Sequence, residues 1–141
     1  MITDYRFSSD LQDMDIDAIH QFLSQSYWSK GLPLSVLQKA MENSMCFGVF
    51  ASDQQQVGFA RMITDKATFA YLADVYILEA HRGKGLSKWL VKNILEHPDL
   101  QGLRRILLAT RDAHELYSRF GFEPVQDATP FMQIWHPKVY Q

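Results

Sequence analysis

One part of this sequence constrains the fold more than any other: a strand-like block, a glycine turn, a helical run and a second strand-like block follow one another. The turn lies in HRGKGLSKWL, residues 81–90, two residues after the apolar block ADVYIL. Residues 86–95 carry apolar side chains at helical spacing, and Pro98 follows shortly afterwards. Residues 105–110, RILLAT, form an apolar run typical of a strand buried on both faces. Because a strand–helix–strand unit favours parallel pairing of its strands, the sequence predicts a mixed α/β fold.

The remaining chain predicts helices and strands on both sides of this unit. Helices are expected at residues 13–24, after Pro33, and at residues 112–120. Further strands are expected at residues 3–7, 44–52, 56–64, 68–78, 122–125 and 131–135. Short polar turns between three of these strands indicate antiparallel hairpins. The predicted order is β-α-α-β-β-β-α-β-α-β-β, about seven strands and four helices in a single domain spanning residues 1–141.

Composition and charge exclude several classes of protein. Hydrophobic residues make up 47% of the chain and charged residues 21%, which suits a folded core. The formal net charge of -2, with both signs intermixed, lacks the positive field that nucleic-acid binding requires. No apolar run approaches the roughly 20 residues of a membrane helix, and the N-terminus lacks a secretory pattern. We therefore expect a soluble cytoplasmic protein without a nucleic-acid or membrane partner. The histidines show no ligand spacing with other donors, so no metal site is expected.

The glycine turn has the chemistry of an anion site. The first N–H groups of a helix lack intrahelical partners and point toward such a turn. Gly83 and Gly85 lack Cβ atoms where a ligand would approach the backbone, while Arg82, Lys84 and Lys88 add positive charge. The spacing matches neither the phosphate loop of nucleoside triphosphatases nor the dinucleotide-binding fingerprint. Two interpretations stand: a phosphate-binding turn, or a glycine-rich helix start with a solvated cationic rim.

Two segments of the chain form a more specific pair of motifs. One is the turn, Arg82-Gly83-Lys84-Gly85-Leu86-Ser87, and the other is AHELYSRFGF at residues 113–122. In this order and spacing they resemble the GNAT superfamily of N-acetyltransferases. That family has an Arg/Gln-x-x-Gly-x-Gly/Ala signature after its fourth strand and an Ala-x-x-Leu-Tyr-x-x-x-Gly-Phe passage near its end. Ser87 departs from the first pattern, although it is also small.

The resemblance implies the GNAT acyl-CoA N-acyltransferase fold, in which the fourth and fifth strands splay apart and leave a slot for a thioester. It implies that Val75, Tyr76 and Ile77 run beside the pantetheine arm of acetyl-CoA, with a main-chain N–H of Tyr76 or Ile77 as oxyanion donor. Thr110 is expected on the opposite wall. The residues expected to hold the CoA pyrophosphate are Arg82, Gly83, Lys84, Gly85, Leu86 and Ser87.

Two residues are candidates for proton transfer. The resemblance implies that Tyr117 lies by the coenzyme sulfur and acts as general acid, whereas its helical position alone favours a core tyrosine. Asp74 is a carboxylate inside an otherwise apolar strand, which makes it a candidate general base. The alternative for Asp74 is an ion pair with an arginine such as Arg61 or Arg111.

The acceptor side is predicted from aromatic residues alone. Tyr27, Trp28, Tyr71 and Phe131 form a possible wall for an amine cation or an apolar group, or simply cover the core. The sequence thus predicts an acetyl-CoA-dependent N-acetyltransferase that acts on a primary amine through a ternary complex. A non-catalytic acyl-CoA sensor or scaffold domain and a nucleotide-phosphate binder are the alternatives. The strands expected near the C-terminus also make a homodimer an expectation.

Overall fold

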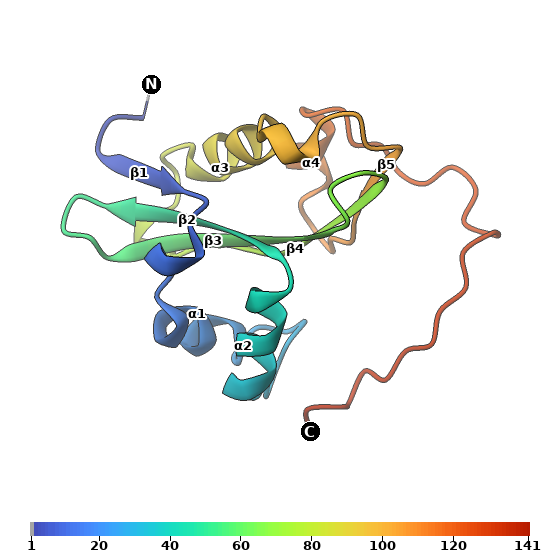
Figure 1. The fold of residues 1–141 in the computed structure, drawn as a ribbon, viewed down its shortest axis with the longest axis horizontal. Coiled ribbons are helices and arrows are strands. Elements are labelled where there is room, and N and C mark those ends of the chain that lie inside the picture. The colour runs from blue at the N-terminus through green and yellow to red at the C-terminus, as the bar shows by residue number, and fades with distance from the viewer. Residues whose placement is uncertain (1) are drawn as a thin grey trace.

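The chain folds around one mixed β-sheet with helices on both faces, as Figure 1 shows. The structure is a computed structural model and describes residues 2–141. Its five strands lie in sequence order across the sheet: β1 (Tyr5–Ser8), β2 (Met45–Ala51), β3 (Gln56–Thr64), β4 (Phe69–Ile77) and β5 (Arg105–Leu108). The first four strands pair antiparallel, and β4 pairs parallel with β5. The parallel pair confirms the predicted crossover.

Two helical layers cover the sheet. On one face lie α1 (Ile16–Leu23) and α2 (Leu34–Glu42), and on the other α3 (Leu86–Leu95) and α4 (His114–Ser118). Asp15 begins α1 by accepting a hydrogen bond from the Ala18 N–H, and Pro33 stands at the N-cap of α2. Single turns of 3-10 helix occur at Leu11–Asp13, Glu79–His81 and Pro98–Leu100.

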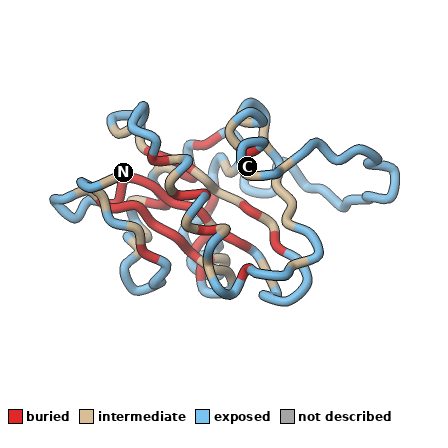
Figure 2. The backbone as a smooth tube through the Cα atoms, turned by 90° about the horizontal axis from the view of Figure 1, so that it is seen from above, coloured by how far each residue is buried: buried red, intermediate tan, exposed pale blue. Residues whose placement is uncertain are grey.

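The core has two parts, one on each side of the sheet. In Figure 2 the buried residues concentrate in the centre of the domain. On the side of α3, Phe47 of β2 is fully buried against a group that includes Leu90. On the side of α1 and α2, the buried group includes Leu23 and Phe59. The apolar faces of the helices thus pack against the sheet, and the strands direct apolar side chains toward both helical layers.

β4 carries a β-bulge near its middle. The pairing of β3 with β4 shifts register between Phe59 and Arg61, so that Asp74 and Val75 together face Ala60. Asp74 has a φ of 59°, in the left-handed region that residues other than glycine seldom adopt. The bulge re-aims the C-terminal half of β4 relative to the rest of the sheet.

The pairing between β4 and β5 is short. It ends at Leu72 and Leu108, although β4 continues to Ile77. Beyond this point the two strands separate, which is the splay that the family resemblance implies. β5 therefore ends at Leu108 rather than at Thr110, because no neighbouring strand remains for the last two residues to bond.

The structure has five strands and not the seven predicted. Residues 122–125 and 131–135 have strand-like patterns, yet neither segment pairs with another strand in the described chain. A strand needs a neighbour for its backbone hydrogen bonds, and these segments leave the sheet after α4. α4 is also shorter than the predicted 112–120, ending at Ser118.

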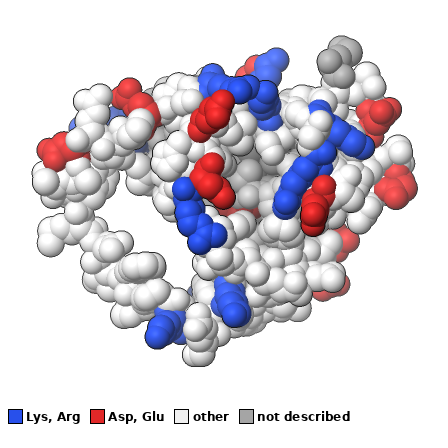
Figure 3. All heavy atoms as spheres, turned by 180° about the vertical axis from the view of Figure 1, so that it is seen from behind, with Lys and Arg blue, Asp and Glu red and all other residues white. Residues whose placement is uncertain are grey.

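Charged residues are spread over the surface. In the view of Figure 3, basic and acidic side chains are interspersed over the body of the domain. Within residues 2–141, no helix is both long enough and apolar enough to cross a membrane. The cytoplasmic location stays a prediction.

Candidate active site

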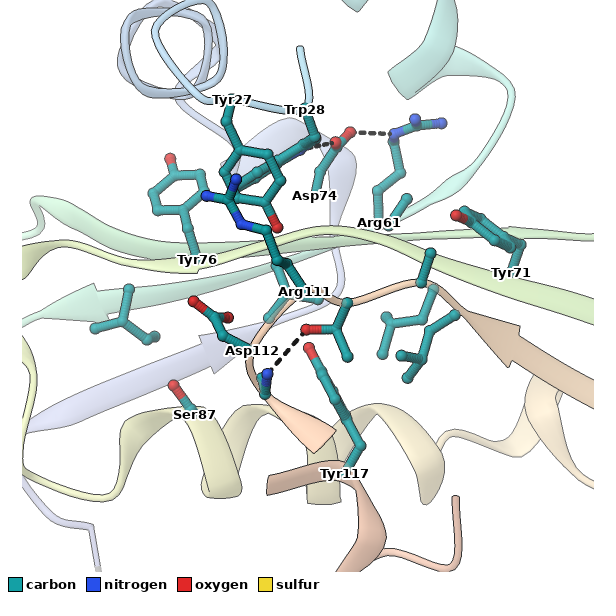
Figure 4. A pocket seen from close by; sticks show the side chains of 18 of the residues that line it. Tyr27, Trp28, Arg61, Tyr71, Asp74, Tyr76, Ser87, Arg111, Asp112 and Tyr117 are labelled. Atoms are coloured by element: carbon teal, nitrogen blue, oxygen red, sulfur yellow. Dashed lines mark hydrogen bonds and ion pairs between the residues drawn. The ribbon is translucent and has the colours of Figure 1, made fainter. Parts of the chain in front are cut away.

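A cleft of about 910 Å³ opens where β4 and β5 separate. One wall is formed by residues 72–77 of β4 and the other by residues 108–113, which follow the paired part of β5. Aromatic side chains from α1 and the loop after it close one end, and Arg82 and Ser87 reach the other. Figure 4 shows these side chains converging on the cleft from the different elements. A volume of this size suits a small-molecule ligand.

The glycine turn forms a second, smaller pocket of about 170 Å³. It adjoins the cleft, because Ile77, Arg82 and Ser87 line both. Gly83 and Gly85 have φ values of 80° and 79°, and a Cβ atom on either would meet nothing within 4 Å. Gly85 is the N-cap of α3, and no side chain caps this helix. The first-turn N–H groups of α3 therefore face open space, as an anion site requires.

Contacts with distant segments hold the turn in place. Arg82 donates a hydrogen bond through Nε to the Ile77 carbonyl oxygen at 2.9 Å, which ties the turn to the end of β4. On the other side, the Tyr5 hydroxyl lies 2.9 Å from Nδ1 of His81 and accepts a hydrogen bond from Lys84 Nζ at 3.1 Å. The sequence did not indicate that β1 supports the turn through Tyr5.

Tyr117 of α4 lies beneath the cleft, with its hydroxyl directed into it (Figure 4). Its ring packs edge-on against Phe122, with ring centroids 5.8 Å apart. Burial, with a smaller contribution from Tyr27, raises the pKa of Tyr117 to about 12. The phenol is therefore protonated near neutral pH and can donate a proton. The Thr110 hydroxyl accepts a hydrogen bond from the Ala113 N–H just before α4 begins.

Asp74 is held by two partners that lie far away in the sequence. Its Oδ2 accepts a hydrogen bond from Arg61 Nε at 2.9 Å, and the two side chains form an ion pair. Its Oδ1 accepts a hydrogen bond from Trp28 Nε1, also at 2.9 Å. The side chains of Asp74 and Arg61 are only 8% and 15% exposed. The carboxylate thus fastens the loop after α1, which carries Trp28, onto the bulge of β4.

Arg111 and Asp112 line the cleft, although the sequence analysis did not propose either as a site residue. The Arg111 guanidinium lies 3.7 Å from the centre of the Tyr27 ring, which is a close cation–π contact. Tyr27 in turn meets Trp28 edge-on, with ring centroids 5.0 Å apart. The one signal in the sequence was that both residues directly follow the apolar run at residues 105–110; in the structure the strand within this run, β5, is only partly buried and not buried on both faces as expected. Their side chains become functional candidates only because the loop after α1 crosses over them.

The structure brings most of the predicted site residues together. Those that line the cleft, the turn pocket or both are Tyr27, Trp28, Tyr71, Asp74, Val75, Tyr76, Ile77, Arg82, Gly83, Gly85, Leu86, Ser87, Thr110 and Tyr117. Two predicted residues lie elsewhere. Lys84 belongs to the turn, but its side chain is directed to Tyr5, and Phe131 stacks against Arg105. Phe131 was expected in an aromatic wall beside the acceptor, but it lies in the exposed segment after α4, where the strand expected at residues 131–135 does not form. In the described chain, no group of three or more His, Cys, Asp or Glu side chains is arranged to hold a metal ion.

Sequence comparison connects this geometry to a family. The sequence profile of the acetyltransferase (GNAT) family matches residues 14–122, which include the cleft walls, the glycine turn and Tyr117. The chain belongs to this family. An acetyltransferase candidate of Gibberella zeae, FG08082, is 36% identical over 138 residues, which cover 82% of this chain and 77% of the relative.

Solved structures agree with the GNAT assignment. The crystal structure of an acetyltransferase candidate of the GNAT family from Xanthomonas campestris pv. campestris is 48% identical and covers 99% of each chain, with a TM-score of 0.95. A structure from Clostridium acetobutylicum, described as an acetyltransferase with acetyl-CoA, covers 93% of this chain and 94% of its own. Its TM-score is 0.66 and its identity 12%, so this likeness shows the fold alone. The GNAT fold inferred from the two motifs is thereby confirmed.

Two substitutions of Asp74 test its hold on Trp28. Asp74→Asn keeps an oxygen acceptor for the indole and suits the left-handed backbone, whereas Asp74→Ala removes the acceptor. We expect indole N–H exchange of Trp28 to be about 10-fold faster in the Ala variant than in the Asn variant, because the asparagine amide oxygen can still accept the indole hydrogen bond and alanine offers no acceptor. The measurement is hydrogen exchange by ¹H–¹⁵N NMR, with the Trp28 resonance assigned through Trp28→Phe. Equal exchange in both variants would contradict the anchoring role.

Proposed function

We propose that this protein transfers an acetyl group from acetyl-CoA directly to a primary amine of a small molecule or peptide, within a ternary complex. The observation that carries the proposal is the continuity of the two pockets. An uncapped helix N-terminus lies at one end, and the Tyr117 hydroxyl and an aromatic wall lie at the other. Membership of the GNAT family supports the reaction class, and the acetyl-CoA in the Clostridium acetobutylicum structure supports the donor.

The residues of the turn and of β4 fit the two halves of acetyl-CoA. The open backbone at Gly83 and Gly85, with the first N–H groups of α3, suits the pyrophosphate. Val75, Tyr76 and Ile77 lie beyond the last residue pair that joins β4 to β5. Their backbone is thus available on that side to an extended amide chain, which is how a peptide-like ligand adds to a sheet edge.

The chemistry then follows from the groups around the cleft. The amine nitrogen attacks the thioester carbonyl carbon, the carbon–sulfur bond breaks, and an N-acetylated amine and the thiol of CoA result. A main-chain N–H of Tyr76 or Ile77 stabilises the negative oxygen of the intermediate. Tyr117 donates a proton to the departing sulfur and recovers one from solvent. Its raised pKa means that the phenol carries this proton near neutral pH.

The amine must also lose a proton, and this step is the more costly one. Neutralising an alkylamine near pH 7 costs roughly 4–5 kcal/mol, whereas releasing a thiolate costs only about 2 kcal/mol. Asp74 is the proposed base, and its two hydrogen bonds also make it the support of Trp28. The two roles are separable, because asparagine can still accept the Trp28 hydrogen bond but cannot accept the proton of an amine.

The acceptor occupies the aromatic side of the cleft in this proposal. Tyr27, Trp28 and Tyr71 provide ring faces and edges that suit an ammonium group before deprotonation, or an apolar substituent. Arg111 already covers the Tyr27 ring, so an acceptor that uses this ring must move the guanidinium aside.

The direct test is CoA thiol release from acetyl-CoA with a panel of primary amines that includes amino acids, polyamines, peptides and drug-like amines. We expect release above the amine-free rate with at least one class, together with a mass increase of one acetyl group on that amine. Binding of acetyl-CoA without release across the panel would contradict the proposal and favour the acyl-CoA sensor or scaffold.

A second prediction concerns the glycine turn. Gly85→Ala places a Cβ in a left-handed conformation that costs roughly 1–2 kcal/mol, and the strain falls on the backbone that faces the pyrophosphate. We expect the Kd of CoA, measured by calorimetry, to rise about 10-fold. Gly102→Ala is the matched control, because Gly102 has a φ of 74° and open space around it but lies outside both pockets. Equal effects of the two substitutions on CoA binding would count against the turn as the CoA site.

A third prediction concerns Tyr117. Tyr117→Phe keeps the ring packing and removes the proton, so kcat near neutral pH should fall by about 100-fold with little change in KM for acetyl-CoA. Because burial raises the pKa of Tyr117 to about 12, the wild-type rate should rise with pH as the amine deprotonates and show no falling limb below about pH 10. The loss in the variant should shrink above about pH 8.5, where a thiolate leaves without help. Unchanged kcat in Tyr117→Phe would exclude the general-acid role.

A further inference from the structure

Residues 123–141 form a C-terminal arm that stands away from the body of the domain. Every residue of the arm is exposed, and the hydrogen bonds described for it join residues within the arm. Figure 2 shows the arm as an exposed loop, and Figure 3 shows an opening between it and the body. The arm meets the body at Arg105, whose guanidinium lies 4.9 Å from the centre of the Phe131 ring. The arm meets the body again at Gly31, whose backbone lies close to the Tyr140 carbonyl oxygen. The approach is so close that a Cβ atom added to Gly31 would lie 2.7 Å from this oxygen.

The centre of the arm has the composition of a buried strand, although it is surrounded by solvent. Residues 131–135 read FMQIW, and Pro130 and Pro137 stand on either side. Met132 is 96% exposed, Ile134 92% and Trp135 69%. In an extended segment, Met132 and Ile134 would share one face. A run of exposed apolar side chains with this alternation marks an interaction surface.

The body offers a matching edge. β5 is the last strand of the sheet, and its outer side has no strand partner in the described chain. The core is also incomplete there, because several apolar side chains that pack on it stay only partly buried. They are Ile106, Leu108, Leu116, Phe120 and Phe122. An unpaired strand edge beside half-covered apolar side chains is a site for an added strand.

We propose that two copies of this chain exchange their arms, so that residues 131–135 of each pair with the outer edge of β5 of the other. Met132 and Ile134 then cover the partly buried side chains at that edge. A second copy is the occupant because the chain itself supplies both halves of the contact, and a two-fold axis satisfies both at once. The arm does not satisfy its own β5, since it passes Arg105 at the start of that strand and continues to Gly31.

The exchange also concerns the cleft. Leu108, Ala109 and Thr110 form part of one cleft wall, and they continue directly from β5. A strand added to β5 braces this wall, whose only strand neighbour in the described chain is the four-residue pairing with β4. The arm exchange is independent of the acetyl-transfer proposal, because its test measures assembly and not activity.

The first experiment measures the mass in solution by sedimentation equilibrium on the full chain. We expect twice the chain mass of 16.3 kDa at micromolar concentration. Ile134→Asp should raise the dimer dissociation constant at least about 100-fold, because a carboxylate would enter an apolar contact twice in each dimer. Val36→Asp is the control, since Val36 is an exposed apolar residue of α2 that belongs neither to the arm nor to β5 and should leave the dimer intact. Circular dichroism is used to check that both variants keep their fold. A monomeric wild-type chain would overturn the proposal.

The second experiment distinguishes exchange from any other dimer. Chains carrying ¹³C-methyl isoleucine are unfolded and refolded with chains carrying ¹³C-methyl leucine, and NOEs between the two labels are recorded. Exchange predicts contacts from the Ile134 methyl to leucine methyls of β5 in the mixed sample, with the Ile134 signal assigned through Ile134→Val. A dimer that lacks these inter-chain contacts would overturn the proposal.

Discussion

β4 and β5 are hydrogen-bonded over four residue pairs and then separate, and the position of nearly every functional group depends on this short pairing. The parallel register places the end of β4 next to the glycine turn, because the chain passes from β4 through that turn into α3 before it returns as β5. The separation leaves the backbone of residues 73–77 uncovered on one side and directs residues 109–113 to the other. A longer pairing would close the cleft, and a shorter one would leave β5 without a hold on the sheet.

The bulge at Asp74 links this opening to the aromatic end of the cleft. Its left-handed φ is a backbone cost that the surrounding contacts must offset. The contacts are the ion pair with Arg61 and the hydrogen bond from Trp28, so the residue that bends the strand also fixes the loop above it. A single side chain thereby couples the shape of the cleft to the position of the aromatic side chains at its end.

Much of the fold could be predicted from local patterns. The α3 boundaries, Leu86–Leu95, agree with the helical spacing of apolar residues, and β3 agrees with the alternating run at 56–64. The predictions fail where a segment needs a neighbouring strand for its hydrogen bonds. Residues 131–135 alternate as a strand does, but within residues 2–141 no neighbouring strand supplies their hydrogen bonds, and they stay exposed to solvent. The last two residues of the predicted fifth strand fail for the same reason.

The same difference between local patterns and long-range contacts applies to the candidate site. The sequence by itself determined the glycine turn and the Tyr117 helix, because each depends on residues that are close together in the chain and on backbone conformations that glycine or a helical repeat imposes. Only the tertiary structure decided that Asp74 binds Trp28 and Arg61, that Tyr5 supports the turn and that Arg111 covers Tyr27. Trp28 and Asp74 are 46 residues apart, and Tyr5 and His81 are 76 apart. Contacts over such separations follow from strand register and loop packing, which no local pattern encodes.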